Sequence, residues 1–228
     1  MKYHVLAACL SVALVAPAFA QSDDFNRSDA PSLGTNWTQQ AGSSAIFSNT
    51  ATGSDISVAT YNGSSGNSVS FDLISSGTGP QYIAAVLGWG SAPNNFFIKV
   101  QANTNSGLFD TYGFYTGNNG GGLFAPLSSS FSQASVTASY VGSLATLTIN
   151  PLGGAQQAYT YDYGFSPTGG VNGLGFWRSA RADNFSSGNL TAAVPEPATW
   201  AMMILGFGVV AGAMRTARRR QKLAVSYA

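Results

Sequence analysis

The chain has 228 residues, of which 45% are hydrophobic, enough to bury a substantial core. Only 8% of the residues are charged, against about 25% in an ordinary soluble domain. The one histidine, one cysteine and one glutamate are His4, Cys9 and Glu196, so residues 21–194 contain none of these three types. A Ser/His/Asp triad, a cysteine nucleophile, a disulfide and a His/Cys zinc site are therefore excluded from this central segment.

Residues 1–20 have the pattern of a secretory signal peptide. Lys2 supplies a positive charge, an apolar stretch follows it, and small residues stand at Ala18 and Ala20. Small residues at these two positions suit signal peptidase, so we predict cleavage after Ala20 and export of the remaining chain. The alternative, a buried first helix, fits less well because Pro17 would interrupt it.

Residues 21–186 have the pattern of one all-β domain. Short segments in which apolar and polar residues alternate are separated by clusters of glycine, asparagine and serine, and none shows a sustained helical period. About ten short strands in one domain are typical of an antiparallel β-sandwich or jelly roll. The predicted strands are 44–48, 55–61, 68–73, 81–89, 96–101, 109–116, 134–141, 144–150, 159–165, 173–178 and 183–186.

Three segments of this domain resemble parts of concanavalin A-like, laminin-G-like sandwich domains. The first, Asp23-Asp24-Phe25-Asn26-Arg27-Ser28-Asp29 with Leu33-Gly34 and Trp37-Thr38, is similar to their opening strand. The second, residues 136–150, is similar to a late hairpin of these domains. The third, residues 173–176 with 182–186, is similar to their closing strands. In that fold the first and last strands lie side by side, which implies that Phe25 lies near Phe185. The expected fold class is therefore all-β, an antiparallel sandwich of the concanavalin A-like type.

Catalysis is not expected of this domain. Glucanases of the concanavalin A-like fold use a pair of glutamates in a pattern like E-x-D-x-x-E, which the chain lacks. Two aspartates could in principle hydrolyse a glycosidic bond, but no Asp-x-Asp spacing occurs on a predicted strand. Asp23 and Asp24 are adjacent, so in a strand they would point to opposite faces. A glycoside hydrolase that works with aspartates is the less favoured alternative.

Aromatic residues make up 12% of the chain, and stacking of their rings on sugar faces requires no titratable group. The candidates for ligand binding lie out of phase with the apolar face of a predicted strand or in a glycine-rich loop: Trp89, Phe97, Tyr112, Tyr115 and Trp177. The alternative is that these rings belong to the core or pair across strands. We expect a carbohydrate-associated or adhesion module, with a purely structural matrix protein without a ligand site as the alternative.

The central domain is mildly acidic, with four basic residues against eight aspartates, which argues against nucleic-acid binding. Asp23, Asp24 and Asp183 would be neighbours if the terminal strands pair, with Asn26 and Asn184 close by. Oxygen ligands of these types suit Ca²⁺, so a calcium site is a hypothesis for this region. The alternative is that these aspartates cap turns. No other cofactor is expected.

The C-terminal part combines a linker, an apolar stretch and a basic tail. Residues 187–194 are small or polar and are predicted to be a linker. From Pro197 to Met214 there are 18 uncharged residues, a helix of about 27 Å, so we predict a transmembrane helix over 198–214. The basic tail, 215–222, stays in the cytoplasm by the positive-inside rule and acts as a stop-transfer signal; it contains Arg215, Arg218, Arg219, Arg220 and Lys222.

The sequence Pro195-Glu196-Pro197, followed by Trp200-Ala201, the apolar stretch and the basic tail, resembles the PEP-CTERM sorting signal in its PEPxxWA variant. The resemblance implies processing near Pro195, Glu196 and Pro197 by exosortase, a membrane cysteine transpeptidase of Gram-negative bacteria that make exopolysaccharide. The protein would be held transiently in the inner membrane and then reach the cell surface or the biofilm matrix. The two prolines keep the motif extended and accessible. A permanent single-span anchor is the alternative.

Overall fold

The computed structural model describes residues 21–90, 95–117 and 120–189. The predicted signal peptide, sorting signal, transmembrane helix and basic tail lie outside these residues. Within them, no helix is long and apolar enough to cross a membrane. The described strands are β1 (Gln21–Asp23), β2 (Trp37–Phe47), β3 (Thr50–Tyr61), β4 (Ser68–Ile74), β5 (Gln81–Trp89), β6 (Phe96–Ala102), β7 (Phe109–Thr116), β8 (Gly120–Phe131), β9 (Gln133–Val141), β10 (Leu144–Pro151), β11 (Gln157–Asp162), β12 (Val171–Trp177) and β13 (Arg181–Gly188).

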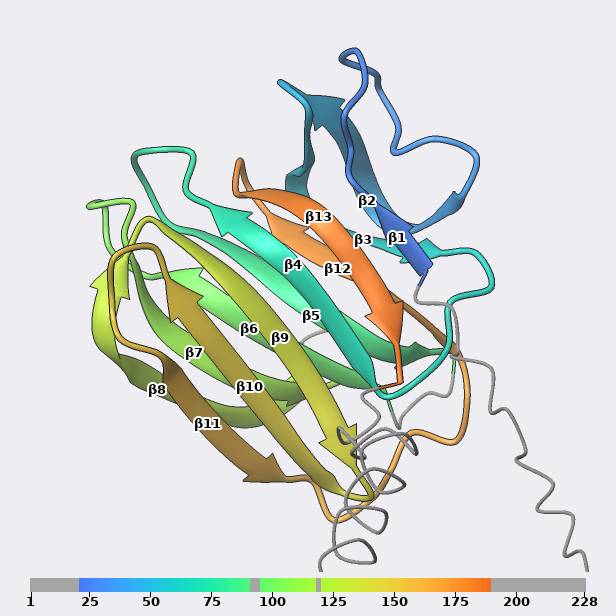
Figure 1. The fold of residues 1–228 in the computed structure, drawn as a ribbon, viewed down its shortest axis with the longest axis vertical. Helices are drawn as coiled ribbons and strands as arrows, with labels where there is room; N and C mark the ends of the chain where they lie inside the picture. The colour runs from blue at the N-terminus through green and yellow to red at the C-terminus, as the bar shows by residue number, and fades with distance from the viewer. Residues whose placement is uncertain (1–20, 91–94, 118–119, 190–228) are drawn as a thin grey trace, which may run out of the picture. The chain divides into compact units, whose positions relative to one another are not determined.

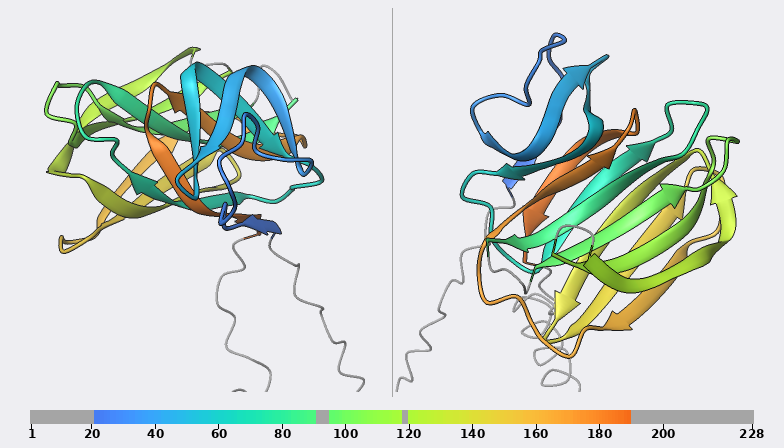
Figure 2. Two further views of the ribbon diagram at one scale, coloured as in Figure 1. Left: turned by 90° about the horizontal axis from the view of Figure 1, so that it is seen from above. Right: turned by 180° about the vertical axis from the view of Figure 1, so that it is seen from behind.

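The strands pack as two antiparallel layers, which confirms the predicted sandwich (Figures 1 and 2). Layer A has the strand order β11-β10-β9-β4-β13, with β1 paired to β13. Layer B has the order β8-β7-β6-β5-β12-β3, with β2 paired to β3. A short ladder between β13 and β3 joins the two layers, with Arg181 opposite Thr52 and Ala182 opposite Ala51.

The hydrophobic core fills the space between the layers. Phe71 on β4 and Leu147 on β10 face it from layer A, and Ile83 on β5, Ile98 on β6 and Phe114 on β7 face it from layer B. All five side chains are almost completely buried. Because successive side chains alternate across a strand, the residues between them point to the outer faces of the sandwich.

The expected contact between the first and last strands is confirmed. Asp23 of β1 lies opposite Phe185 of β13. The ring of Trp37 lies 5.6 Å from that of Phe25 and 4.8 Å from that of Phe185, so all three belong to one buried aromatic cluster. The last strand continues to Gly188, two residues beyond the predicted end of the domain.

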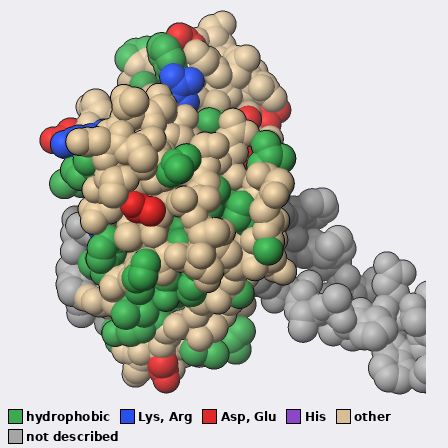
Figure 3. Space-filling view, turned by 90° about the vertical axis from the view of Figure 1, so that its left-hand side faces the viewer, with side chains coloured by type: hydrophobic (Ala, Val, Ile, Leu, Met, Phe, Trp, Pro, Cys, Tyr) green, Lys and Arg blue, Asp and Glu red, His purple; other side chains and the backbone are tan. Residues whose placement is uncertain are grey.

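One long strand, β8, is not predicted from the sequence. Glycines at its start, Pro126 in its middle and serines near its end all weaken a strand pattern. Among the described strands β8 pairs only with β7, so it forms the edge of layer B, where a proline is tolerated because no further strand needs its N–H. Hydrophobic side chains gather in the lower half of the side of the molecule that carries this edge (Figure 3), and Phe124 of β8 is 43% exposed.

Candidate functional site

The outer face of layer B carries a second group of packed aromatic rings, separate from the main core, which we call the aromatic face. The right-hand view of Figure 2 looks at layer B from this side. The face is built by residues of β5, β6, β7, β8 and β12: Tyr82, Trp89, Phe97, Lys99, Tyr115, Phe124 and Trp177. Four of the five predicted ligand-binding residues, all except Tyr112, are therefore brought together.

Small residues on the strands let two of these rings lie flat against the sheet. A Cβ added to Gly175 would lie 2.6 Å from Cζ of Phe97, and one added to Gly113 would lie 2.2 Å from Cε2 of Tyr115. The rings therefore occupy the space that a side chain would take. Ala84, buried beside them, adds only a methyl group to the same face. The result is a broad aromatic surface.

A bulge in β5 turns Trp89 to the aromatic face. Simple alternation would point Trp89 to the core, on the same side as Ile83 and Leu87. The register between β12 and β5 shifts by one residue before Trp89, and Gly88 there has a φ of +72°, which glycine adopts readily. The buried side chain of Asn172 accepts a hydrogen bond from the Gly88 N–H (3.0 Å) and holds this bulge in place.

Lys99 lies among the rings of the aromatic face. Its Nζ is 4.3 Å from the ring centre of Tyr115, 4.8 Å from that of Tyr82 and 5.9 Å from that of Phe124. These distances are typical of cation–π interactions, which stabilise the ammonium group. Burial lowers the pKa of Lys99 to about 8, so the side chain is protonated at neutral pH. The guanidinium of Arg178 lies 4.7 Å from the ring of Trp177 and adds a second positive charge to the face.

The rings differ in how much of their surface is open. Trp89, Tyr115 and Trp177 are half-buried, and with Phe124 they present rings to solvent. Phe97 is only 1% exposed and supports the others from below.

Tyr112 lies on the core side of β7, where its ring stacks on that of Tyr159 at 3.9 Å. In this structure neither Phe97 nor Tyr112 offers a free face to a ligand. Tyr82, Lys99 and Phe124 contribute to the face although the sequence pattern does not single them out. The alternation of Phe97, Lys99 and Gln101 on β6 is the signal that would have found Lys99.

Tyr82 places a polar group inside the aromatic face. Its side chain is 3% exposed, and its hydroxyl oxygen has no hydrogen-bond partner among the described residues. Burial is the main cause that raises its pKa to about 12, and the nearby Asp55 carboxylate adds to it. The hydroxyl is therefore a neutral and enclosed group that a buried water molecule can satisfy.

Carboxylates are sparse on layer B. Its described strands carry Asp55 on β3 and Asp110 on β7, with β12, β5 and β6 between them. Four strand spacings separate β3 from β7, about 19 Å at the usual distance between strands. The carboxyl pair of a glycosidase lies about 5–9.5 Å apart.

The three aspartates of the calcium hypothesis lie near the paired terminal strands. Asp23 is engaged: its carboxylate accepts hydrogen bonds from Arg27 (2.7 and 2.9 Å) and from Nε1 of Trp37 (2.7 Å). Burial alone would raise the pKa of Asp23, but these hydrogen bonds outweigh it and hold the pKa below its usual range. Asp24 is exposed, and Asp183 accepts the N–H of Asn184. The described residues contain no group of three metal-binding side chains, and the calcium site stays a prediction.

Comparison with solved structures agrees with this fold. A β-glucanase of Bacillus licheniformis is similar at a TM-score of 0.53 and 10% identity, covering 76% of this chain and 99% of that one. A carbohydrate-binding module, CBM66, of Bacillus subtilis has a TM-score of 0.44 and 18% identity, covering 68% and 94%. A lectin of Bauhinia forficata in complex with GalNAc has a TM-score of 0.42 and 13% identity, covering 74% and 98%. The domain is an all-β sandwich of the concanavalin A-like jelly-roll type.

The C-terminal sequence is matched by a family model. The PEP-CTERM protein-sorting motif matches residues 193–220, which confirms the resemblance carried by Pro195-Glu196-Pro197. The chain therefore carries a sorting motif of exported cell-surface or extracellular proteins. No curated protein sequence matches the chain.

Proposed function

We propose that this protein is a non-catalytic carbohydrate-associated module of the cell surface or extracellular matrix, which binds exopolysaccharide through the aromatic face. The observation that carries the proposal is the arrangement of Trp89, Tyr115, Phe124 and Trp177 as open rings on one face of a rigid sheet. Rings of this kind can stack on the C–H faces of sugars. The exposed guanidinium of Arg178, beside the ring of Trp177, supplies donors for sugar oxygens.

At the aromatic face, binding without hydrolysis is favoured by the distribution of carboxylates on layer B. Asp55 and Asp110 are separated by three strands, too far to act on one glycosidic bond as a pair. Stacking and hydrogen bonding by the aromatic face also require no metal, so we propose that binding is unaffected by EDTA. The net negative charge of residues 21–194 supports a partner other than nucleic acid.

The route to the cell surface is part of the same proposal. Signal peptidase removes residues 1–20 after Ala20, and the 198–214 helix holds the chain transiently in the inner membrane with the basic tail in the cytoplasm. Exosortase then processes the chain near Pro195–Pro197. Mass spectrometry of the exported protein tests this route: the expected product begins at Gln21 and lacks residues 200–214. A product that retains Trp200 through Met214 would support a permanent anchor instead.

Affinity electrophoresis tests the binding. Full-length protein is run through gels that contain the producer's exopolysaccharide or one of a panel of neutral and uronate-containing polysaccharides. We expect retardation by at least one polysaccharide, a reduction in the Trp177→Ala variant, and no release of reducing ends from the polysaccharide. Equal mobility in all gels would argue for a purely structural matrix protein, and equal retardation of the wild type and W177A would show that binding does not use the aromatic face.

A further inference from the structure

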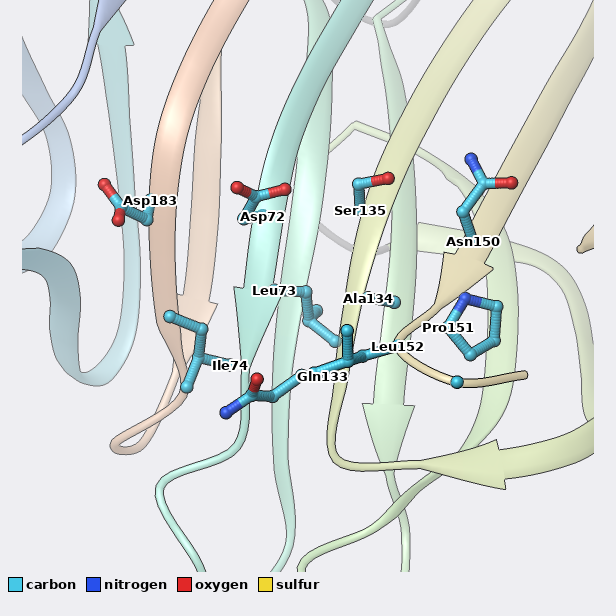
Figure 4. A pocket seen from close by; sticks show the side chains of 11 residues that line it. Asp72, Leu73, Ile74, Gln133, Ala134, Ser135, Asn150, Pro151, Leu152 and Asp183 are labelled. Carbon is cyan, nitrogen blue, oxygen red and sulfur yellow. The ribbon is translucent and has the colours of Figure 1, made fainter. Parts of the chain in front are cut away.

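Figure 4 shows a groove on the outer face of layer A. Layer B carries the aromatic face on its own outer side, so the two sites lie on opposite sides of the sandwich. The groove has a volume of about 420 Å³ and is lined by residues of β4, β9, β10 and β13 and of the turn that follows β10. Sites for small ligands commonly have volumes of about 300–1,000 Å³. The groove is therefore large enough for a ligand and belongs to no part of the proposed polysaccharide site.

A row of polar side chains crosses this groove. Asp183, Asp72, Ser135 and Asn150 lie opposite one another on the adjacent strands β13, β4, β9 and β10. Figure 4 shows the four side chains at the same level on the outer face. Three strand spacings give the row a length of about 14 Å. Ser135 and Asn150 are exposed, so a hydroxyl and an amide are open to a ligand beside the carboxylates.

A bulge in β13 fixes the carboxylate of Asp72 in this row. The register between β13 and β4 shifts between Asp183 and Ser186, and Asn184 has a left-handed φ of +49°. Asparagine is one of the few residues that adopt this conformation readily. Its Nδ2 donates a hydrogen bond to Oδ2 of Asp72 (2.7 Å), which leaves Oδ1 to accept from a ligand. Bulges commonly redirect side chains next to binding sites.

An aliphatic ledge runs beside the polar row. Ile74, Gln133 and Leu152 form the next level of side chains in Figure 4, and the backbone N–H of Leu152 donates to the carbonyl of Gln133 (2.9 Å). Leu152 is 79% exposed, so its side chain is accessible beside the polar row. A sugar ring presents hydroxyls at its edge and C–H groups on its face, so it matches a polar row next to an aliphatic ledge.

We propose that this groove binds a neutral saccharide chain, independently of the aromatic face. The carboxylate of Asp72, the Ser135 hydroxyl and the Asn150 amide hydrogen-bond the sugar hydroxyls, while Ile74 and Leu152 contact the C–H face. Carboxylates are strong acceptors for hydroxyl groups, because hydrogen bonds to a charged partner are stronger than neutral ones.

The charge of the groove selects against acidic sugars. Burial raises the pKa of Asp183, and the carboxylates of Asp72, Asp24 and Asp23 raise it further, against the lowering by the Asn184 N–H. These groups create a negative potential that repels uronates and phosphates. The aliphatic side chains of Ile74 and Leu152 offer C–H contacts that a metal ion or a small amine would not use, and for this reason we favour a neutral saccharide over either of them.

The test uses a background in which the aromatic face is disabled. Full-length W177A protein is run by affinity electrophoresis through gels that contain a neutral galactomannan or a neutral β-glucan. Ser135→Trp fills the groove without removing a charge, and the double variant Asp72→Asn/Asn150→Ala removes the polar row. The matched controls are Thr160→Trp, an exposed strand residue on β11, and Asp110→Asn, a half-buried aspartate that accepts one backbone hydrogen bond.

We expect W177A to retain measurable retardation by a neutral polysaccharide. S135W and D72N/N150A should each weaken that binding at least ten-fold, while T160W and D110N leave it unchanged. The proposal would be overturned if W177A showed no binding to either polysaccharide, or if the groove variants bound like the controls. It would also be overturned if D72N/N150A lost binding of Ca²⁺ or poly-lysine but not of sugar, or if wild type released reducing ends that D72N/N150A did not. Failure of the aromatic-face proposal would give a different result: W177A would then bind the polysaccharide as well as wild type does.

Discussion

Asp23→Ala is expected to destabilise the domain by about 4 kcal/mol. Asp23 accepts four hydrogen bonds, from the Phe25 N–H (2.9 Å), from Nε1 of Trp37 (2.7 Å) and from two nitrogens of Arg27. Phe25 is 0% and Trp37 8% exposed, so both N–H groups would stay buried without a partner, at about 1–3 kcal/mol each. Arg27, with a side chain 38% exposed, can turn to water and adds about 1 kcal/mol or less.

Urea unfolding of the full-length protein measures this loss, which is a large share of the roughly 5–15 kcal/mol typical of a domain. The control is Asp24→Ala, because Asp24 is exposed and, among the residues that the structure describes, accepts only the Asn26 N–H. D24A should change the free energy of unfolding by about 0.5 kcal/mol or less. Equal destabilisation by D23A and D24A would refute the reasoning, because it would mean that the buried hydrogen bonds to Asp23 add no more to the free energy of unfolding than the exposed one to Asp24.

The low pKa of Asp23 stabilises the fold above about pH 4, and this contribution is lost as the pH falls through the folded-state value, so thermal melts of wild type and D23A should converge in acid. The pKa of Lys99 is about 8 in the folded protein and about 10.4 in the unfolded chain. The free energy of unfolding of wild type, measured in urea relative to that of Lys99→Met, should therefore rise from about pH 8 to pH 10. If the difference between the two free energies did not change with pH, this would contradict the burial of Lys99. Gly113→Ala places a methyl where the Tyr115 ring lies and should weaken polysaccharide binding as much as Tyr115→Ala does, whereas unchanged retardation would show that this ring is not used.

The strands that the sequence predicts well are those buried on one face. Val69, Phe71 and Leu73 alternate with polar residues, and β4 has the corresponding burial pattern. Edge strands carry weaker signals, because fewer neighbours constrain their side chains. β8, with Pro126 and many serines and glycines, is missed for this reason, and β2 begins at Trp37 although its predicted part starts only at residue 44.

The aromatic face could be predicted only in part. Alternation places Phe97 and Lys99 together, but nothing in the local pattern tells that Gly175 lets the Phe97 ring lie flat and become buried. Tyr112 and Tyr115 are three positions apart and lie on opposite faces of β7, and the stacking of Tyr112 on Tyr159 of the other layer decides which one belongs to the core. The groove of layer A depends on the register of four strands, which a single sequence does not reveal.

Two phenylalanines allow the most direct measurement of binding by the aromatic face. Phe124 lies on the aromatic face and is 43% exposed, whereas Phe47 of β2 is 47% exposed and lies outside it. Full-length Phe124→Ala and Phe47→Ala are compared with wild type by affinity electrophoresis on the polysaccharide that retards wild type most. Binding through the aromatic face predicts about a five-fold or greater loss of affinity in F124A, equivalent to about 1 kcal/mol, and none in F47A. Equal affinity of the two variants would contradict it.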